Sequence, residues 1–74
     1  MTDQAAPKNA RKAFEKAEKA YQKQDLEEAE KNLQLALKDY SKFASAWFRL
    51  GQIHMEYYRV KEARDAFAKA IATD

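Results

Sequence analysis

The chain lacks cysteine, and its 74 residues include a single glycine and a single proline. Without cysteine the chain can form no disulfide bond, no thiolate zinc site and no cysteine nucleophile. So little glycine and proline also excludes collagen-like repeats and the turn-dense sequences of all-β domains. One glycine cannot form a glycine-rich loop around a phosphate group, which excludes nucleotide sites of that kind.

Long hydrophobic runs are missing as well, and neither sign of charge dominates. No stretch free of Asp, Glu, Lys and Arg is long enough to span a membrane, and the N-terminus has no apolar signal segment. We therefore expect a cytoplasmic location and no membrane partner. The 14 basic and 12 acidic residues give a net charge of +2, which argues against a nucleic acid or another polyanion as the partner.

Apolar residues at helical spacing are what the sequence does contain. The chain is long enough for one domain at most, and with 46% hydrophobic residues it is too apolar to be disordered. Apolar side chains at steps of three and four predict an all-α protein with helices over about residues 7–21, 26–40, 43–57 and 60–73. We expect Val60 and Ile71 to face inward on the last helix. The third helix is apolar nearly all round, which predicts packing on several sides.

A shift of 34 residues superposes the two halves of the chain. Matched pairs are Phe14 with Phe48, Ala17 with Gly51, Ala29 with Ala63, Leu33 with Phe67, and Leu37 with Ile71. Two helices in each 34 residues is the period of a helical solenoid unit. Gly51 and Ala63 would be small where two antiparallel helices approach closely, and the large Phe67 would fill the space between them.

The second half carries a recognisable pattern, Trp47-x2-Leu50-Gly51-x2-His54 followed by Ala63-x3-Phe67-x2-Ala70. It resembles the tetratricopeptide repeat, which has Trp, Leu, Gly and Tyr on its first helix and Ala and Phe on its second. The resemblance covers about residues 8–74 and implies two stacked helix–turn–helix units, four antiparallel helices in a short right-handed solenoid. The units would be residues 8–41 and 42–74, after a flexible segment of residues 1–7, and the second unit would have no capping helix.

The turn inside each unit departs from this family. Gln24 and Tyr58 stand where the family commonly has a glycine in the left-handed conformation, which is less favourable for other residues. Residues 56–62 contain no helix breaker. As an alternative, the third and fourth helices could therefore fuse and exchange between two chains.

The resemblance also implies a concave groove, lined by the first helix of each unit, that binds a peptide or a protein segment. Carried over position by position, the groove residues are Arg11, Phe14, Glu18 and Tyr21 from the first unit and Ser45, Phe48, Gln52 and Met55 from the second. This half-apolar surface suits an amphipathic helix or an extended peptide with apolar side chains. Ordinary packing beneath a further repeat is the alternative interpretation of the same residues.

A carboxylate clamp is not expected in this groove. Family members that bind the C-terminal carboxylate of chaperones use Lys and Asn at groove positions of successive first helices. Here Phe14, Glu18 and Arg49 stand at those positions. The resemblance therefore favours an apolar ligand over a carboxylate.

No third unit covers the last predicted helix in this sequence, so one side of its apolar residues lacks a partner. The residues concerned are Val60, Ala63, Phe67, Ala70 and Ile71. Burying a large apolar side chain contributes roughly 1.5–3 kcal/mol. We therefore expect that these residues drive self-association into a homo-oligomer, or that a parent chain supplies a capping helix. The alternative function is therefore a self-assembling structural unit with no separate ligand.

The remaining polar features favour structure over chemistry. Lys12, Lys16, Lys19 and Lys23 form a stripe on the first helix, but Glu15 lies among them, which predicts a solvated face. The single histidine has no second histidine, cysteine or suitably spaced carboxylate pair, so we expect no metal, cofactor or catalytic residue. The sequence predicts a protein-interaction module that is not an enzyme.

Overall fold

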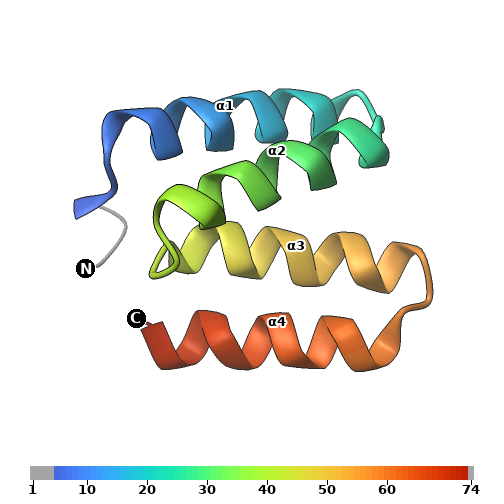
Figure 1. Ribbon diagram of the computed structural model, residues 1–74. Helices are drawn as coiled ribbons and strands as arrows, with labels where there is room; N and C mark the ends of the chain where they lie inside the picture. The colour runs from blue at the N-terminus through green and yellow to red at the C-terminus, as the bar shows by residue number, and fades with distance from the viewer. Residues whose placement is uncertain (1–4, 74) are drawn as a thin grey trace.

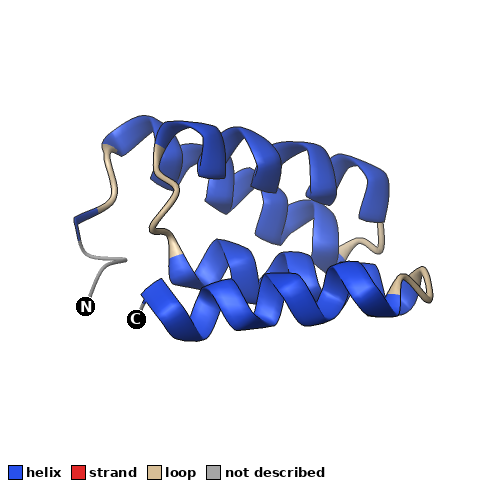
Figure 2. Cartoon of the chain, turned by 60° about the horizontal axis from the view of Figure 1, so that its bottom comes forward, coloured by secondary structure: helices blue, strands red, loops and turns tan. Residues whose placement is uncertain are grey.

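The computed structural model describes residues 5–73, and these residues form four α-helices joined by short turns (Figure 1). The helices are α1 (Lys8–Gln22), α2 (Leu26–Asp39), α3 (Ala44–Glu56) and α4 (Val60–Thr73). No strand is present between residues 5 and 73 (Figure 2). The all-α prediction is confirmed, and each predicted helix is present with ends that differ by one residue at most.

The helices form two antiparallel hairpins that stack side by side. α1 packs on α2 in the first hairpin, α3 packs on α4 in the second, and α2 joins the hairpins by packing on α3. The turns inside the two hairpins lie at one end of the molecule, and the turn between the hairpins lies at the other (Figure 1). Both hairpins therefore run in the same direction, as a repeat of the sequence requires.

Part of the segment before α1 packs against the core, although we expected residues 1–7 to be flexible. Residues 1–4 of the segment predicted to be flexible lie outside the described residues. Ala6 is 5% exposed and belongs to the hydrophobic core. Pro7 is the N-cap of α1, one position before the first helical turn in which we expected it. Its carbonyl oxygen accepts a hydrogen bond of 3.0 Å from the Arg11 amide.

Small side chains dominate the core between the helices. Leu33 and Ile53 are its largest fully buried side chains, and alanines of all four helices surround them. Because alanine is small, it lets the backbones of two packed helices approach closely. Phe43, in the turn between the hairpins, adds an aromatic cluster, because its ring lies 4.9 Å from the Phe14 ring and 6.0 Å from the Tyr40 ring.

The expectation that Val60 and Ile71 face inward is wrong. Val60 is 62% exposed and Ile71 is 80% exposed. The reason is that α4 packs mainly on α3, and the side it buries is made of Ala63, Ala66 and Ala70. The larger apolar residues of α4 border that contact or lie outside it.

The turn inside each hairpin ends its first helix with a left-handed residue, Gln24 at φ 62° and Tyr58 at φ 60°. Both turns close with the same pair of backbone hydrogen bonds. In the first, the Asp25 amide donates to the Ala20 carbonyl at 2.9 Å and the Gln24 amide donates to the Tyr21 carbonyl at 2.9 Å. This is the Schellman arrangement, which normally uses glycine. α3 and α4 are therefore separate helices here, folded back on each other rather than fused.

Asp25 has a second role in the first turn. Its side-chain Oδ1 accepts a hydrogen bond of 3.2 Å from the Glu28 amide and so caps the N-terminus of α2. The position 34 residues later is Arg59, whose side chain has no acceptor. Instead, Arg59 Nη1 forms an ion pair of 2.9 Å with Glu30 Oε2 of the first hairpin.

Candidate interaction groove

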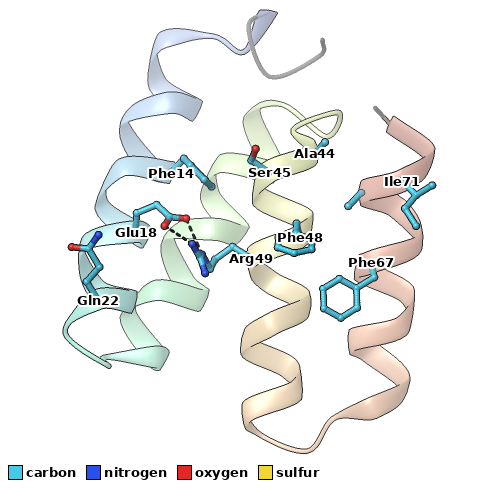
Figure 3. A pocket seen from close by; sticks show the side chains of 10 residues that line it. Phe14, Glu18, Gln22, Ala44, Ser45, Phe48, Arg49, Phe67 and Ile71 are labelled. Atoms are coloured by element: carbon cyan, nitrogen blue, oxygen red, sulfur yellow. Dashed lines mark hydrogen bonds and ion pairs between the residues drawn. The ribbon is translucent and has the colours of Figure 1, made fainter.

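An open groove of about 1030 Å³ crosses the face formed by α1, α3 and α4 (Figure 3). α1 forms one edge, α3 forms the floor and α4 forms the other edge. Its lining residues are Phe14, Glu18 and Gln22 of α1, Ala44, Ser45, Phe48 and Arg49 of α3, and Phe67, Ala70 and Ile71 of α4. We call this surface the groove.

Half of the predicted groove residues line it. Phe14, Glu18, Ser45 and Phe48 do so, while Arg11 is exposed on α1 outside it. The other three lie nearby. Tyr21 borders a neighbouring hollow, and Gln52 accepts a hydrogen bond from Arg49. Met55, near the end of α3, lines a different surface together with residues of α4.

The α4 edge of the groove was not part of the predicted groove. Phe67, Ala70 and Ile71 stand among the residues predicted for self-association, yet they also line this surface. The spacing of apolar residues could not predict that they line the groove. It places them on one face of α4 but does not give the orientation of that face relative to α3.

Exposed aromatic carbon gives the groove its apolar character. The Phe48 side chain projects from the α3 floor and is 52% exposed. Its ring lies 5.5 Å from the ring of Phe67, at an angle of 54° between the planes. Aromatic rings at such a distance and tilt attract each other, so the two side chains form one apolar wall.

The charged residues of the groove neutralise each other. Arg49 on α3 binds the Glu18 carboxylate of α1 with two hydrogen bonds of 2.9 Å, from Nε to Oε1 and from Nη2 to Oε2 (Figure 3). The hydrogen bond to Glu18 raises the pKa of Arg49 above its ordinary value, although partial burial opposes this effect. The Arg49 guanidinium carbon also lies 4.2 Å above the centre of the Tyr21 ring. Because Arg49 is held by this pair, it is not positioned to bind a carboxylate from a ligand.

Polar contacts of the same kind join the hairpins below the groove. The Tyr21 hydroxyl donates a hydrogen bond of 3.1 Å to Glu56 Oε2, and Arg59 binds Glu30. Together with the Arg49 pair, these contacts fix α3 against α1 and α2. The floor of the groove is therefore held in position before any ligand binds.

A second apolar surface lies on the outer side of α4, and we call it the α4 face. It is lined by Met55, Val60, Ala63, Arg64, Phe67, Ala68 and Ile71. It shares Phe67 and Ile71 with the groove, whereas Val60 belongs to the α4 face alone. Ala70, also predicted for self-association, is 8% exposed and lies on the groove side.

Among the described residues, no group of three or more His, Cys, Asp or Glu side chains is arranged to hold a metal ion. His54 is half buried, and its Nδ1 lies 3.5 Å from Arg59 Nη1. The lysines of the α1 stripe are all exposed. Within residues 5–73, no helix combines the length and apolar character needed to cross a membrane.

No family model matches this chain, and neither a curated protein nor a solved structure matches it. The groove is therefore interpreted from its own geometry and from the repeat in the sequence.

Proposed function

We propose that the chain is a non-enzymatic protein-interaction module whose groove binds an apolar segment of another protein. The observation that carries the proposal is the apolar wall of Phe48 and Phe67 beside an internally neutralised ion pair. Exposed aromatic anchors in a hollow of this kind contribute most of the energy in protein interfaces.

The proposal includes the repeat type. We propose that the two hairpins are tetratricopeptide units. The left-handed residues Gln24 and Tyr58 and the close contact of Gly51 with Phe67 support this, because both features occur at the positions that the repeat pattern assigns to them. In that family the first helix of each unit, here α1 and α3, lines the binding groove.

The chemistry of the groove indicates the class of ligand. Glu18 and Arg49 already satisfy each other, so a charged ligand group gains little by displacing one of them. A ligand with aliphatic or aromatic side chains along one edge gains from covering Phe48. We therefore propose an amphipathic helix, or an extended peptide with alternate apolar residues, as the ligand.

A displayed library of random 16-residue peptides, selected on the immobilised chain, tests the proposal. We expect the enriched peptides to share two or three large apolar residues at helical or alternate spacing. Replacement Phe48→Ala should weaken their binding at least tenfold, about 1.4 kcal/mol.

The matched control is Leu35→Ala. Leu35 is an apolar residue of α2 with 49% exposure, similar to that of Phe48, and it does not line the groove. We expect this variant to bind the selected peptides as the unchanged chain does. Peptides that bind equally well to both variants, or peptides enriched in acidic residues alone, would contradict the proposal.

A further inference from the structure

The α4 face is an apolar surface that stays uncovered in the described part of the chain. Val60 and Ile71 are large aliphatic residues with 62% and 80% exposure, and Met55 beside them is 48% exposed. Arg64 is the only charged residue that lines this face. Such a surface on a small domain indicates a protein contact.

The spacing of the larger residues along this face is the same from either end. Val60, Arg64, Phe67 and Ile71 follow one another at steps of four, three and four along α4. Suppose that α4 of a second copy lies antiparallel to α4 of the first, with the two-fold axis between them passing midway between Arg64 and Phe67. Val60 of each copy then lies opposite Ile71 of the other, and Arg64 lies opposite Phe67. The one charge of the face then lies against an aromatic ring, where a guanidinium binds favourably.

Ala63 lines the α4 face but is only 1% exposed, because it packs against α3. The contact between two copies therefore rests on Val60, Arg64, Phe67 and Ile71. A face that complements itself in this way suits a two-fold contact, in which each copy contributes the same patch.

A competing arrangement would continue the repeat: α1 of a second copy would dock on the α4 face in the way that α3 docks on the first hairpin. The repeat in the sequence argues against it. Phe43 contacts the first hairpin, and the buried residues that follow it on α3 at steps of three and four are Ala46, Leu50 and Ile53. The corresponding residues of the first hairpin, 34 positions earlier, are Asn9, Lys12, Lys16 and Lys19, all exposed. Docking α1 on an apolar face would bury three lysines, which is strongly unfavourable.

We propose that two copies of this chain associate through their α4 faces as a closed antiparallel dimer. The lysine side of α1 then remains in water at each outer end, as the polar end faces of repeat arrays require. The dimer proposal does not rest on the proposed groove function, although its contact includes Phe67 and Ile71, which also line the groove.

Sedimentation equilibrium of the full chain tests the association. At a few hundred micromolar we expect about twice the monomer mass of 8.6 kDa. The variants Val60→Glu and Ile71→Glu should each reduce the dimer at least tenfold, because each places a charged carboxylate within the apolar contact. Both sites are exposed, so the variants keep the fold, and circular dichroism verifies this. Leu35→Glu, at an apolar residue of α2 that is 49% exposed and lies outside the α4 face, should sediment as the unchanged chain does.

Cysteine pairs test the antiparallel arrangement directly, because the chain has no cysteine of its own. A variant with both Val60→Cys and Ile71→Cys should form a covalent dimer on mild oxidation. The two sites on one helix are about 16 Å apart, too far for a disulfide within one chain. Either single variant should stay uncrosslinked, because its two cysteines are separated by about the same distance across the dimer.

Three results would overturn the proposal. One is a monomer mass at a few hundred micromolar, and another is a dimer that persists in Val60→Glu and Ile71→Glu alike. The third is rapid crosslinking of a single-cysteine variant, which would indicate a parallel contact. The groove proposal is tested by peptide selection and the Phe48→Ala variant, not by sedimentation. A failure of the dimer proposal therefore does not count against the groove proposal.

Discussion

Gly51 of α3 lies against the ring of Phe67 of α4, and a Cβ atom at position 51 would be 2.6 Å from the nearest ring carbon. The corresponding pair in the first hairpin is Ala17 with Leu33, both of them fully buried. Across the repeat, a smaller residue on the first helix accompanies a bulkier one on the second. The size lost at one position of the pair is therefore regained at the other, so the two hairpins fill this contact with different side chains.

We expect Gly51→Ala to destabilise the protein by about 1–2 kcal/mol, because the added methyl group displaces the Phe67 ring and outweighs the better helix propensity of alanine. Adding Phe67→Leu recreates the pair of the first hairpin and should remove the clash. Chemical denaturation of the two single variants and the double variant measures the coupling. A coupling energy below about 0.5 kcal/mol would show that the two residues do not limit each other.

Glycine at the two left-handed positions should stabilise the chain. Gln24→Gly and Tyr58→Gly each remove a conformational penalty of about 1 kcal/mol, and Tyr58 is 90% exposed, so few contacts are lost. Thermal unfolding should show a higher Tm for each variant. Gln34→Gly, inside α2, is the matched control and should lower stability by about 1 kcal/mol. Equal effects of Gln24→Gly and Gln34→Gly would contradict the turn geometry.

The Glu18–Arg49 pair should contribute modestly and depend on salt. The two side chains are 25% and 26% exposed, so solvent screens much of their attraction. A double-mutant cycle with Glu18→Gln and Arg49→Gln should give a coupling of about 0.5–1 kcal/mol at low ionic strength and less in 1 M salt. Glu15→Gln, on the exposed side of the same helix, should change stability by less than about 0.5 kcal/mol. A coupling that does not respond to salt would argue against an ionic contribution.

The lysine side of α1 should prevent end-to-end growth. The triple variant Lys12→Ala, Lys16→Leu and Lys19→Ile gives α1 the residues that α3 presents to the first hairpin. A head-to-tail contact does not close on itself, so this variant should form species larger than a dimer as concentration rises. Light scattering measures the change. Adding Ile71→Glu should abolish the larger species, and growth that is unaffected by that change would place the contact elsewhere.

The helices and most of the core could be predicted from the sequence because both follow from the spacing of apolar residues. The repeat added the positions of the turns, since Gln24 and Tyr58 correspond to each other across the two hairpins. Gly51 could be assigned to a close helix contact because it is the only glycine and stands inside a helix pattern. These features depend on local sequence, which a single chain displays directly.

Other features depend on which helices lie side by side, and spacing along one helix does not contain that information. The sequence placed Arg49 at a groove position but did not predict its ion pair with Glu18, because Glu18 belongs to a different hairpin. Asn32 is 6% exposed, and its amide donates to the carbonyl and the carboxylate of Glu28. When a polar side chain forms its hydrogen bonds within its own helix, it can be buried although its residue type predicts exposure. Val60 and Ile71 were misplaced because an amphipathic pattern does not tell a covered apolar side from an open one.

The difference between Asp25 and Arg59 sets an order in which the hairpins become rigid. The first turn is closed by its own residues, because Asp25 caps α2 without help from the rest of the chain. The second turn is joined through Arg59 to Glu30, which is in place only when the first hairpin has formed. We therefore expect the second hairpin to depend more on the first than the reverse, and amide hydrogens of α4 should exchange with solvent before those of α2.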